Sequence, residues 1–168
     1  MKVVAYSVKT FEKEFLAKAN QKKHDITLIS NSLNPETVLY AVGKDAIVVC
    51  AHDDLSAWVI EQLAAMGIKY IATRSASTDH IDKEAAAAHG INLANVPVYP
   101  LLHNIINHPN VLVTPHQNNL SPEALQQIAD QTIKTLDLWH QDKCVGKACV
   151  CNKSCRAAEK AAIPLNVL

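Results

Sequence analysis

The chain has 168 residues, of which 49% are hydrophobic and 19% charged, and its formal net charge is zero. This length accommodates one domain with a substantial core, and the balanced charge creates no strong field for nucleic acid or an anionic membrane. No apolar run approaches the roughly 20 residues that span a bilayer, and the opening "MKVVAYSV" lacks the long apolar core of a signal peptide. We therefore expect a cytoplasmic protein without nucleic-acid or membrane partners.

Five short apolar runs alternate with helical patterns over the first hundred residues. The runs are β-branched and apolar on both faces, which is typical of parallel strands covered by helices. They are 3–8, 26–30, 46–50, 69–73 and 91–96, and the clearest helical patterns between them are 11–23, 56–66 and 83–89. This alternation predicts a flavodoxin-like α/β fold, which is a doubly wound parallel sheet of five strands.

Glycines stand at the junctions of this alternation. Gly43, Gly67 and Gly90 each follow a helical pattern and precede a strand, where the residue past a helix end often needs a positive φ. The fourth glycine is Gly146, and all four are more than twenty residues apart. Neither G-x-G-x-x-G nor a Walker loop is therefore possible. The usual backbone cradle for the pyrophosphate of a dinucleotide is missing.

The last long helical pattern covers 121–141. Ser121 favours an N-cap, Pro122 suits the first helical position, and Glu123 lies in the first turn. The apolar stripe that follows predicts packing on the sheet, and after Asp142 the chain offers little to bury.

Two other classes with this fold fit the strand ends poorly. A flavodoxin would hold its phosphate on the loop after the first strand, but "YSVKTFE" has no glycine there. A response-regulator receiver needs acids after the first strand and an Asp after the third. Asp53 and Asp54 do follow the third run, yet the first ends in Tyr6 and Ser7.

A family pattern runs through three stretches of the chain. They are "KYIATRSASTDHIDKEAAAAHGINLANVPVY" (69–99), "HPNVLVTPHQ" (108–117) and "EALQQIADQTIKTLDLW" (123–139). Together they resemble the D-isomer-specific 2-hydroxyacid dehydrogenases, and D-lactate dehydrogenases in particular, over about residues 1–150. In that family an NAD-binding Rossmann domain lies between N-V-P-x-Y and T-P-H. A direct join near Pro100 stands in place of most of it here, which agrees with the missing glycine motif.

The resemblance implies a set of site residues. His116 matches the catalytic acid/base that exchanges a proton with the substrate oxygen while hydride moves at C2, a task suited to imidazole. Ala76 and Ser77 match the loop whose N–H groups hold the substrate carboxylate. Tyr99 and Tyr6 match aromatic residues that line the substrate pocket. The family's carboxylate-clamping Arg and its His-orienting Glu belong to the missing domain, so no cofactor-binding residue is assigned.

The sequence thus predicts the substrate-binding and catalytic domain of an NAD-dependent oxidoreductase for small 2-hydroxy or 2-oxo acids. Because the coenzyme domain is missing, we expect the chain to be inactive alone. Two alternatives are a module that only binds such acids and an interaction partner of a full-length paralogue. Apolar surface bared by the missing domain also predicts a homo-oligomer.

The predicted domain covers 1–142, and the remaining 143–168 form a Cys-rich tail that we expect to be mobile. The tail cysteines have the spacing C-x4-C-x-C-x3-C; they are Cys144, Cys149, Cys151 and Cys155. Four thiolates could hold zinc or an iron–sulfur cluster, although the usual C-x2-C pairs are absent. Adventitious oxidation and a tail without any role are the alternatives.

Charged residues after the fourth run have structural explanations. Arg74 is predicted to pair with Asp79 or Asp82, in preference to binding substrate. Asp82 itself is predicted to cap the helix that follows it.

Overall fold

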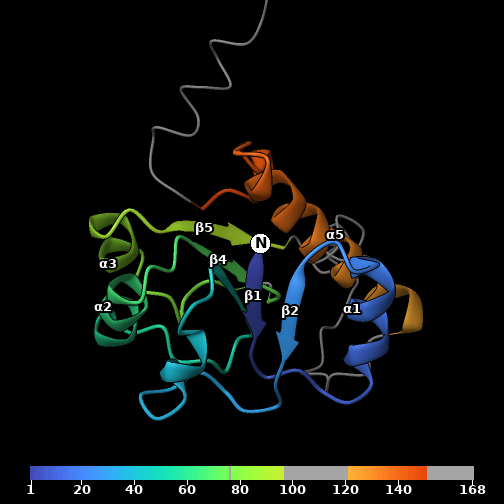
Figure 1. Cartoon of the computed structure of the whole chain (residues 1–168), viewed down its shortest axis with the longest axis horizontal. Helices are drawn as coiled ribbons and strands as arrows, with labels where there is room; N and C mark the ends of the chain where they lie inside the picture. The colour runs from blue at the N-terminus through green and yellow to red at the C-terminus, as the bar shows by residue number, and fades with distance from the viewer. Residues whose placement is uncertain (76, 97–120, 151–168) are drawn as a thin grey trace, which may run out of the picture.

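The computed structural model describes residues 1–75, 77–96 and 121–150 (Figure 1). Its centre is a parallel sheet of five strands in the order β2-β1-β3-β4-β5. The strands are β1 (Lys2–Ala5), β2 (Asp25–Leu28), β3 (Ala46–Val49), β4 (Tyr70–Thr73) and β5 (Asn92–Asn95). This order confirms the predicted flavodoxin-like fold. Each strand overlaps its predicted run and begins within one residue of the predicted start.

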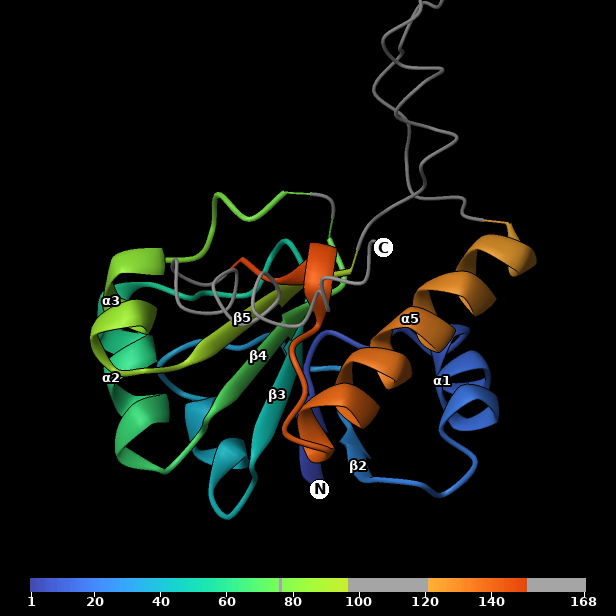
Figure 2. The same cartoon turned by 90° about the horizontal axis from the view of Figure 1, so that it is seen from above.

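Helices cover both faces of the sheet, as Figure 2 shows. One face carries α1 (Glu12–Asn20) and α5 (Pro122–His140), and the other carries α2 (Ala57–Ala65) and α3 (Lys83–Ala88). Before β3 the chain forms only a short 3-10 helix, η1 (Val38–Ala41), where the sequence shows a helical pattern. No described helix is both long and apolar enough to cross a membrane.

Alternate residues of the strands supply two separate cores. On β1, Val4 faces the α2 and α3 side, whereas Val3 and Ala5 face the α1 and α5 side. All four residues of β3 are buried, because helices cover both of its faces. Burial of each such aliphatic side chain contributes roughly 1.5–3 kcal/mol, so both helical layers are needed for stability.

Local signals at the element ends are confirmed. Gly43, Gly67 and Gly90 adopt φ of 73°, 87° and 67°. A Cβ built on any of them would meet nothing within 4 Å. Glycine is therefore needed at these positions for the positive φ and not to make room for a neighbouring segment. The carboxylate of Asp82 accepts a hydrogen bond from Ala85 N at 2.9 Å, which confirms the predicted cap of α3.

The end of α5 and the described residues after it, 141–150, pack against the sheet. Ser121 caps the start of α5, as predicted. The helix ends at His140, and Asp142 just after it adopts a φ of 54°. Val145 is then buried, which contradicts the prediction that little is buried beyond Asp142. Cys149 forms an antiparallel bridge with β5, and Val150 N donates to the backbone oxygen of a β5 residue at 2.9 Å. The described part of the tail thus covers the outer edge of the sheet.

Candidate functional site

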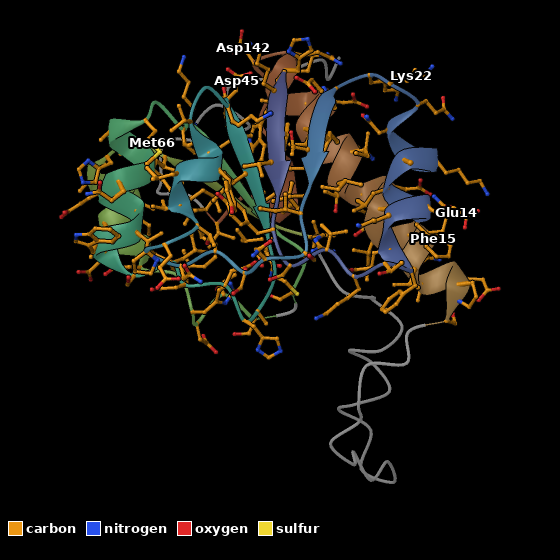
Figure 3. All side chains as sticks on the ribbon, turned by 60° about the horizontal axis from the view of Figure 1, so that its bottom comes forward. Glu14, Phe15, Lys22, Asp45, Met66 and Asp142 are labelled. Atoms are coloured by element: carbon orange, nitrogen blue, oxygen red, sulfur yellow. The ribbon has the colours of Figure 1, made fainter. Side chains whose placement is uncertain are left out.

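The carboxyl ends of the parallel strands meet at one edge of the sheet, which is where α/β domains of this kind bind ligands. The opposite, amino-terminal edge is marked by Asp45 and Asp142 in Figure 3. Both of these carboxylates raise the pKa of Tyr70 there, after the larger effect of its burial. The candidate site is therefore built from the loops that follow β1, β3 and β4.

Asp53 joins three of the loops at this edge. It follows β3, is only 2% exposed, and accepts three hydrogen bonds. Its Oδ1 accepts from Ser7 Oγ at 2.7 Å and from Leu33 N at 2.8 Å, while Oδ2 accepts from Cys50 N at 2.6 Å. Ser7 adopts a φ of 53°, which is uncommon for a residue with a side chain. The carboxylate thus fixes the paths of the loops after β1, β2 and β3.

Sequence reasoning noted Asp53 only as a residue that a receiver domain would need. A better signal was available, because an acid directly after a buried strand reaches the carboxyl edge of the sheet. Backbone N–H groups of neighbouring loops converge there, and a carboxylate can accept several of them.

Tyr6 lies in the core beneath this edge. Its side chain is fully buried, and its hydroxyl donates to the backbone oxygen of Thr37 at 3.2 Å. Burial is the main cause of a strongly raised pKa for Tyr6, and the nearby Asp53 carboxylate adds to it. The hydroxyl therefore stays protonated, and its proton is used in the bond to Thr37. A contact between Tyr6 and a substrate stays a prediction.

Arg74 pairs with Glu12 of α1, so the predicted pairing with Asp79 or Asp82 is wrong. The guanidinium is buried, and its Nη1 donates to Glu12 Oε1 at 2.5 Å. Its Nη2 donates to the backbone oxygen of Tyr6 at 3.0 Å. The rigid guanidinium fork therefore joins the end of β4 to the end of β1 and the start of α1.

A hollow between α1 and α5 lies beside this ion pair. Its lining is mostly apolar and consists of Glu12, Phe15, Leu16, Arg74, Leu125, Ile128 and Ala129. Phe15 is labelled on α1 in Figure 3. Within this lining Glu12 supplies the only negative charge that faces the guanidinium.

Hydroxyl groups order the loop after β4. Thr73 Oγ1 and Ser75 Oγ are 2.8 Å apart, and Ser75 Oγ donates to the backbone oxygen of Ser77 at 2.6 Å. Ser77 Oγ donates to Asp79 Oδ2 at 2.7 Å and accepts from Asp79 N at 3.0 Å. Within the described residues, the N–H groups of Ser77 and Thr78 donate no hydrogen bond. They are therefore available to an acceptor from outside the loop.

His80 borders the same loop. Its Nε2 is buried and has no hydrogen-bond partner in the described part of the chain. Burial lowers the pKa of His80, the carboxylates of Asp53 and Asp79 oppose that shift, and His52 adds to it. The ring is therefore neutral near pH 7.

Several residues of the predicted site lie outside the described residues. They are Ala76, Tyr99, His116, Cys151 and Cys155. Of the other tail cysteines, Cys144 and Cys149 are half-buried. Among the residues that the structure describes, no group of three or more metal-ligating side chains comes together. A zinc or iron–sulfur site in the tail stays a prediction.

The described residues do not fit an NAD coenzyme. A Rossmann cradle needs a glycine-rich turn directly after a strand, at the start of a helix. Gly43, Gly67 and Gly90 precede strands instead and lie at the opposite edge of the sheet. The loop after β1 has no glycine and is fixed by Asp53.

Comparisons with known proteins agree with this geometry. A family model described as D-isomer specific 2-hydroxyacid dehydrogenase, catalytic domain, matches residues 3–148. An aromatic 2-oxoacid reductase of Clostridium sporogenes is 38% identical over 100 residues, which cover 59% of this chain and 30% of the reductase. A D-lactate dehydrogenase of Lactobacillus delbrueckii subsp. bulgaricus is 29% identical over 154 residues, which cover 83% of this chain and 46% of that protein.

The fold of solved structures matches as well. The apo-structure of D-lactate dehydrogenase from Escherichia coli aligns with a TM-score of 0.58 and 31% sequence identity. The alignment covers 63% of this chain and 35% of that one. The chain therefore spans about a third to a half of the length of the relatives described here.

Proposed function

Since the chain belongs to the D-isomer specific 2-hydroxyacid dehydrogenases through their catalytic domain, we propose that it binds a small 2-hydroxy or 2-oxo acid at the loop after β4. The N–H groups around Ala76 and Ser77 would hold the substrate carboxylate. His116 would exchange a proton with the oxygen on C2, and Tyr99 and Tyr6 would line the pocket. The relatives bear names that refer to lactate and to aromatic 2-oxoacids, which sets the range of acids to test.

The observation that carries this proposal is the pair of unused donors in the loop. The N–H groups of Ser77 and Thr78 donate no hydrogen bond within the described residues, although hydroxyl bonds order the loop around them. Successive N–H groups at the carboxyl end of a strand form a favourable site for an anion. A carboxylate that accepts them would gain hydrogen bonds without breaking any in the loop.

The charges near the loop favour weak binding. The carboxylate of Asp79 lies within the loop and would repel an incoming anion. Arg74 is the cation at the end of β4, but its guanidinium is already paired with Glu12 and turned toward the end of β1. We therefore expect dissociation constants in the millimolar range, corresponding to about 4 kcal/mol of binding free energy.

Binding is tested by titrating the purified chain with pyruvate, D-lactate and phenylpyruvate while recording amide chemical shifts. We expect the Ser77 and Thr78 resonances to move with at least one of the three acids. Ser77→Pro removes one donor and should abolish the shift of Thr78, whereas Ser77→Ala keeps the N–H and should preserve it. Unmoved resonances at about 10 mM of every acid would exclude this binding function.

We also propose that the chain does not oxidise NADH by itself. Hydride transfer requires a positioned nicotinamide, and neither the sequence motif nor the described loops offer a cradle for its dinucleotide. The assay is NADH oxidation with the same 2-oxo acids, run beside a His116→Ala variant. Turnover that depends on His116 in the isolated chain would contradict the proposal.

A second candidate function is assembly with a full-length paralogue, whose site this chain would complete or compete for. The observation that favours it is that residues 3–148 match a catalytic domain, while the described loops offer no cradle for the coenzyme. Mixing the chain with such a paralogue should change its rate of NADH oxidation, and the two should elute together. An unchanged rate at all mixing ratios would dismiss this candidate.

A further inference from the structure

A buried histidine joins the corner between α1 and β2 to the last turns of α5. The side chain of His24 is only 1% exposed, and its Nε2 lies 3.0 Å from Asp137 Oδ1 of α5. Lys23 Nζ lies 3.1 Å from the other oxygen of that carboxylate. Asn20 fixes the backbone of His24 with two hydrogen bonds, of 2.9 and 3.0 Å. The imidazole is therefore fixed by α1 on one side and by α5 on the other.

The hydrogen bonds of this imidazole fit only its neutral form. Nδ1 of His24 is buried and has no partner among the described residues. With the proton on Nε2, the ring donates to Asp137, and Nδ1 keeps a lone pair that needs no donor. A second proton on Nδ1 would create a buried N–H without an acceptor, which is destabilising.

Most of the charges around His24 also disfavour its protonation. The N-terminal amine of Met1, just before β1, repels a positive imidazole, and the ring of His140 on α5 stands edge-on to it at 5.8 Å. Lys23 adds another positive charge, whereas the carboxylate of Asp137 attracts the protonated ring. Burial is the main cause of a lowered pKa for His24, and the N-terminus adds to that lowering. The attraction of Asp137 offsets these effects only in part.

We propose that His24 is a pH-dependent latch, which keeps the C-terminal turns of α5 docked on the domain while it is neutral and loosens them when it is protonated. Among the described residues, α5 is held by side-chain contacts with α1 and the sheet, and the chain after it pairs with β5. Leu136 and Trp139 are buried in the turns beside Asp137, and Trp139 stacks on Tyr70 with ring centroids 4.9 Å apart.

The direction of the pH dependence follows from the lowered pKa of His24 in the docked state. When α5 loosens, His24 regains the ordinary histidine pKa of about 6.5. Docking is therefore fully favoured above that pH and weakens as the pH falls from there toward the lowered value. One proton is taken up when α5 loosens. Each fall of one pH unit in this window therefore raises the ratio of loosened to docked α5 by up to about tenfold.

Trp139 provides the readout for this latch. The chain has two tryptophans, and Trp58 is about half exposed on α2. A Trp58→Phe background therefore leaves Trp139 as the only indole. Between about pH 7.5 and about pH 5, we expect its emission to shift toward that of a solvated indole. His24→Gln can still donate to Asp137 but cannot take up the proton, so its emission should stay nearly constant.

Two controls separate the latch from other titrations. His140→Gln removes the neighbouring histidine and should keep the transition, weakened and moved to slightly lower pH, because His140 contributes to the lowered pKa of docked His24. The protection factors of amides in α2, corrected for the intrinsic exchange rate at each pH, should stay constant while those in the last turns of α5 fall. An undiminished transition in His24→Gln, or a parallel fall of protection in α2, would overturn the proposal.

Discussion

Replacing Asp53 by Asn should destabilise the domain severely, although the two side chains have the same shape. Asp53 is 2% exposed and accepts hydrogen bonds from Ser7 Oγ, Leu33 N and Cys50 N at 2.6–2.8 Å. An Asn side chain has one oxygen and one NH2 group. In either orientation the NH2 group faces a backbone N–H, from Cys50 or from Leu33, so at least one buried donor loses its acceptor.

The cost follows from the loss of charge and of one acceptor. A hydrogen bond to a charged group is worth about 1.5–3 kcal/mol, a neutral one about 0.5–1.5, and an unsatisfied buried donor costs about 1–3. We therefore expect Asp53→Asn to lower the free energy of unfolding by about 3–5 kcal/mol, out of a typical total of about 5–15 kcal/mol. The measurement is urea denaturation at neutral pH, followed by circular dichroism.

Asp54→Asn is the matched control. Asp54 is the next residue, and within the described residues its Oδ1 accepts a single bond, from Ser56 N at 2.9 Å near the surface. Asn accepts such a bond about as well as Asp, so this change should cost less than about 1 kcal/mol. If the two variants unfold within about 1 kcal/mol of each other, the role assigned to the Asp53 carboxylate is refuted.

Three further predictions concern the packing of the domain. Arg74→Lys cannot reach Glu12 and the end of β1 together, so it should cost about 2–4 kcal/mol in the same denaturation assay; an unchanged midpoint would contradict this. Leu136→Ala should cost about 2–5 kcal/mol because Leu136 is fully buried, and half-buried Leu138→Ala should cost clearly less; equal losses would refute the packing of α5. A chain ending at Lys143 uncovers the edge of β5, so it should self-associate more strongly than the full chain in sedimentation velocity. A monomer at all concentrations would count against that role of the tail.

Local patterns allowed the fold to be predicted. The alternation of apolar runs and helical patterns was enough for the strand order, because right-handed crossovers leave few arrangements of a parallel sheet. Gly67 and the caps at Asp82 and Ser121 act within a few residues of their partners, so the sequence displays them directly. The short η1 was harder to predict, because Asn34 bonds Thr37 N with its side chain and tightens the turn.

Contacts between distant segments were not predictable in the same way. Arg74 and Glu12 are 62 residues apart, and they meet because β1 and β4 both end at the same edge of the sheet. Asp79 was the expected partner by proximity in sequence, but the hydroxyl of Ser77 already occupies it. The pairing of Val150 was missed for a similar reason, since its partner is on β5, far back in the chain.

The junction between β5 and α5 has a consequence for how such a domain can grow. The strand ends at Asn95 and the helix begins at Pro122, yet Ala94 of the strand and Leu136 of the helix share one core cluster. A folded module spliced in at this junction would lengthen the polypeptide without disturbing any other strand. The domain should therefore tolerate an insertion here. A recombinant chain carrying an unrelated small domain at this position should unfold at the same midpoint temperature as the chain without it.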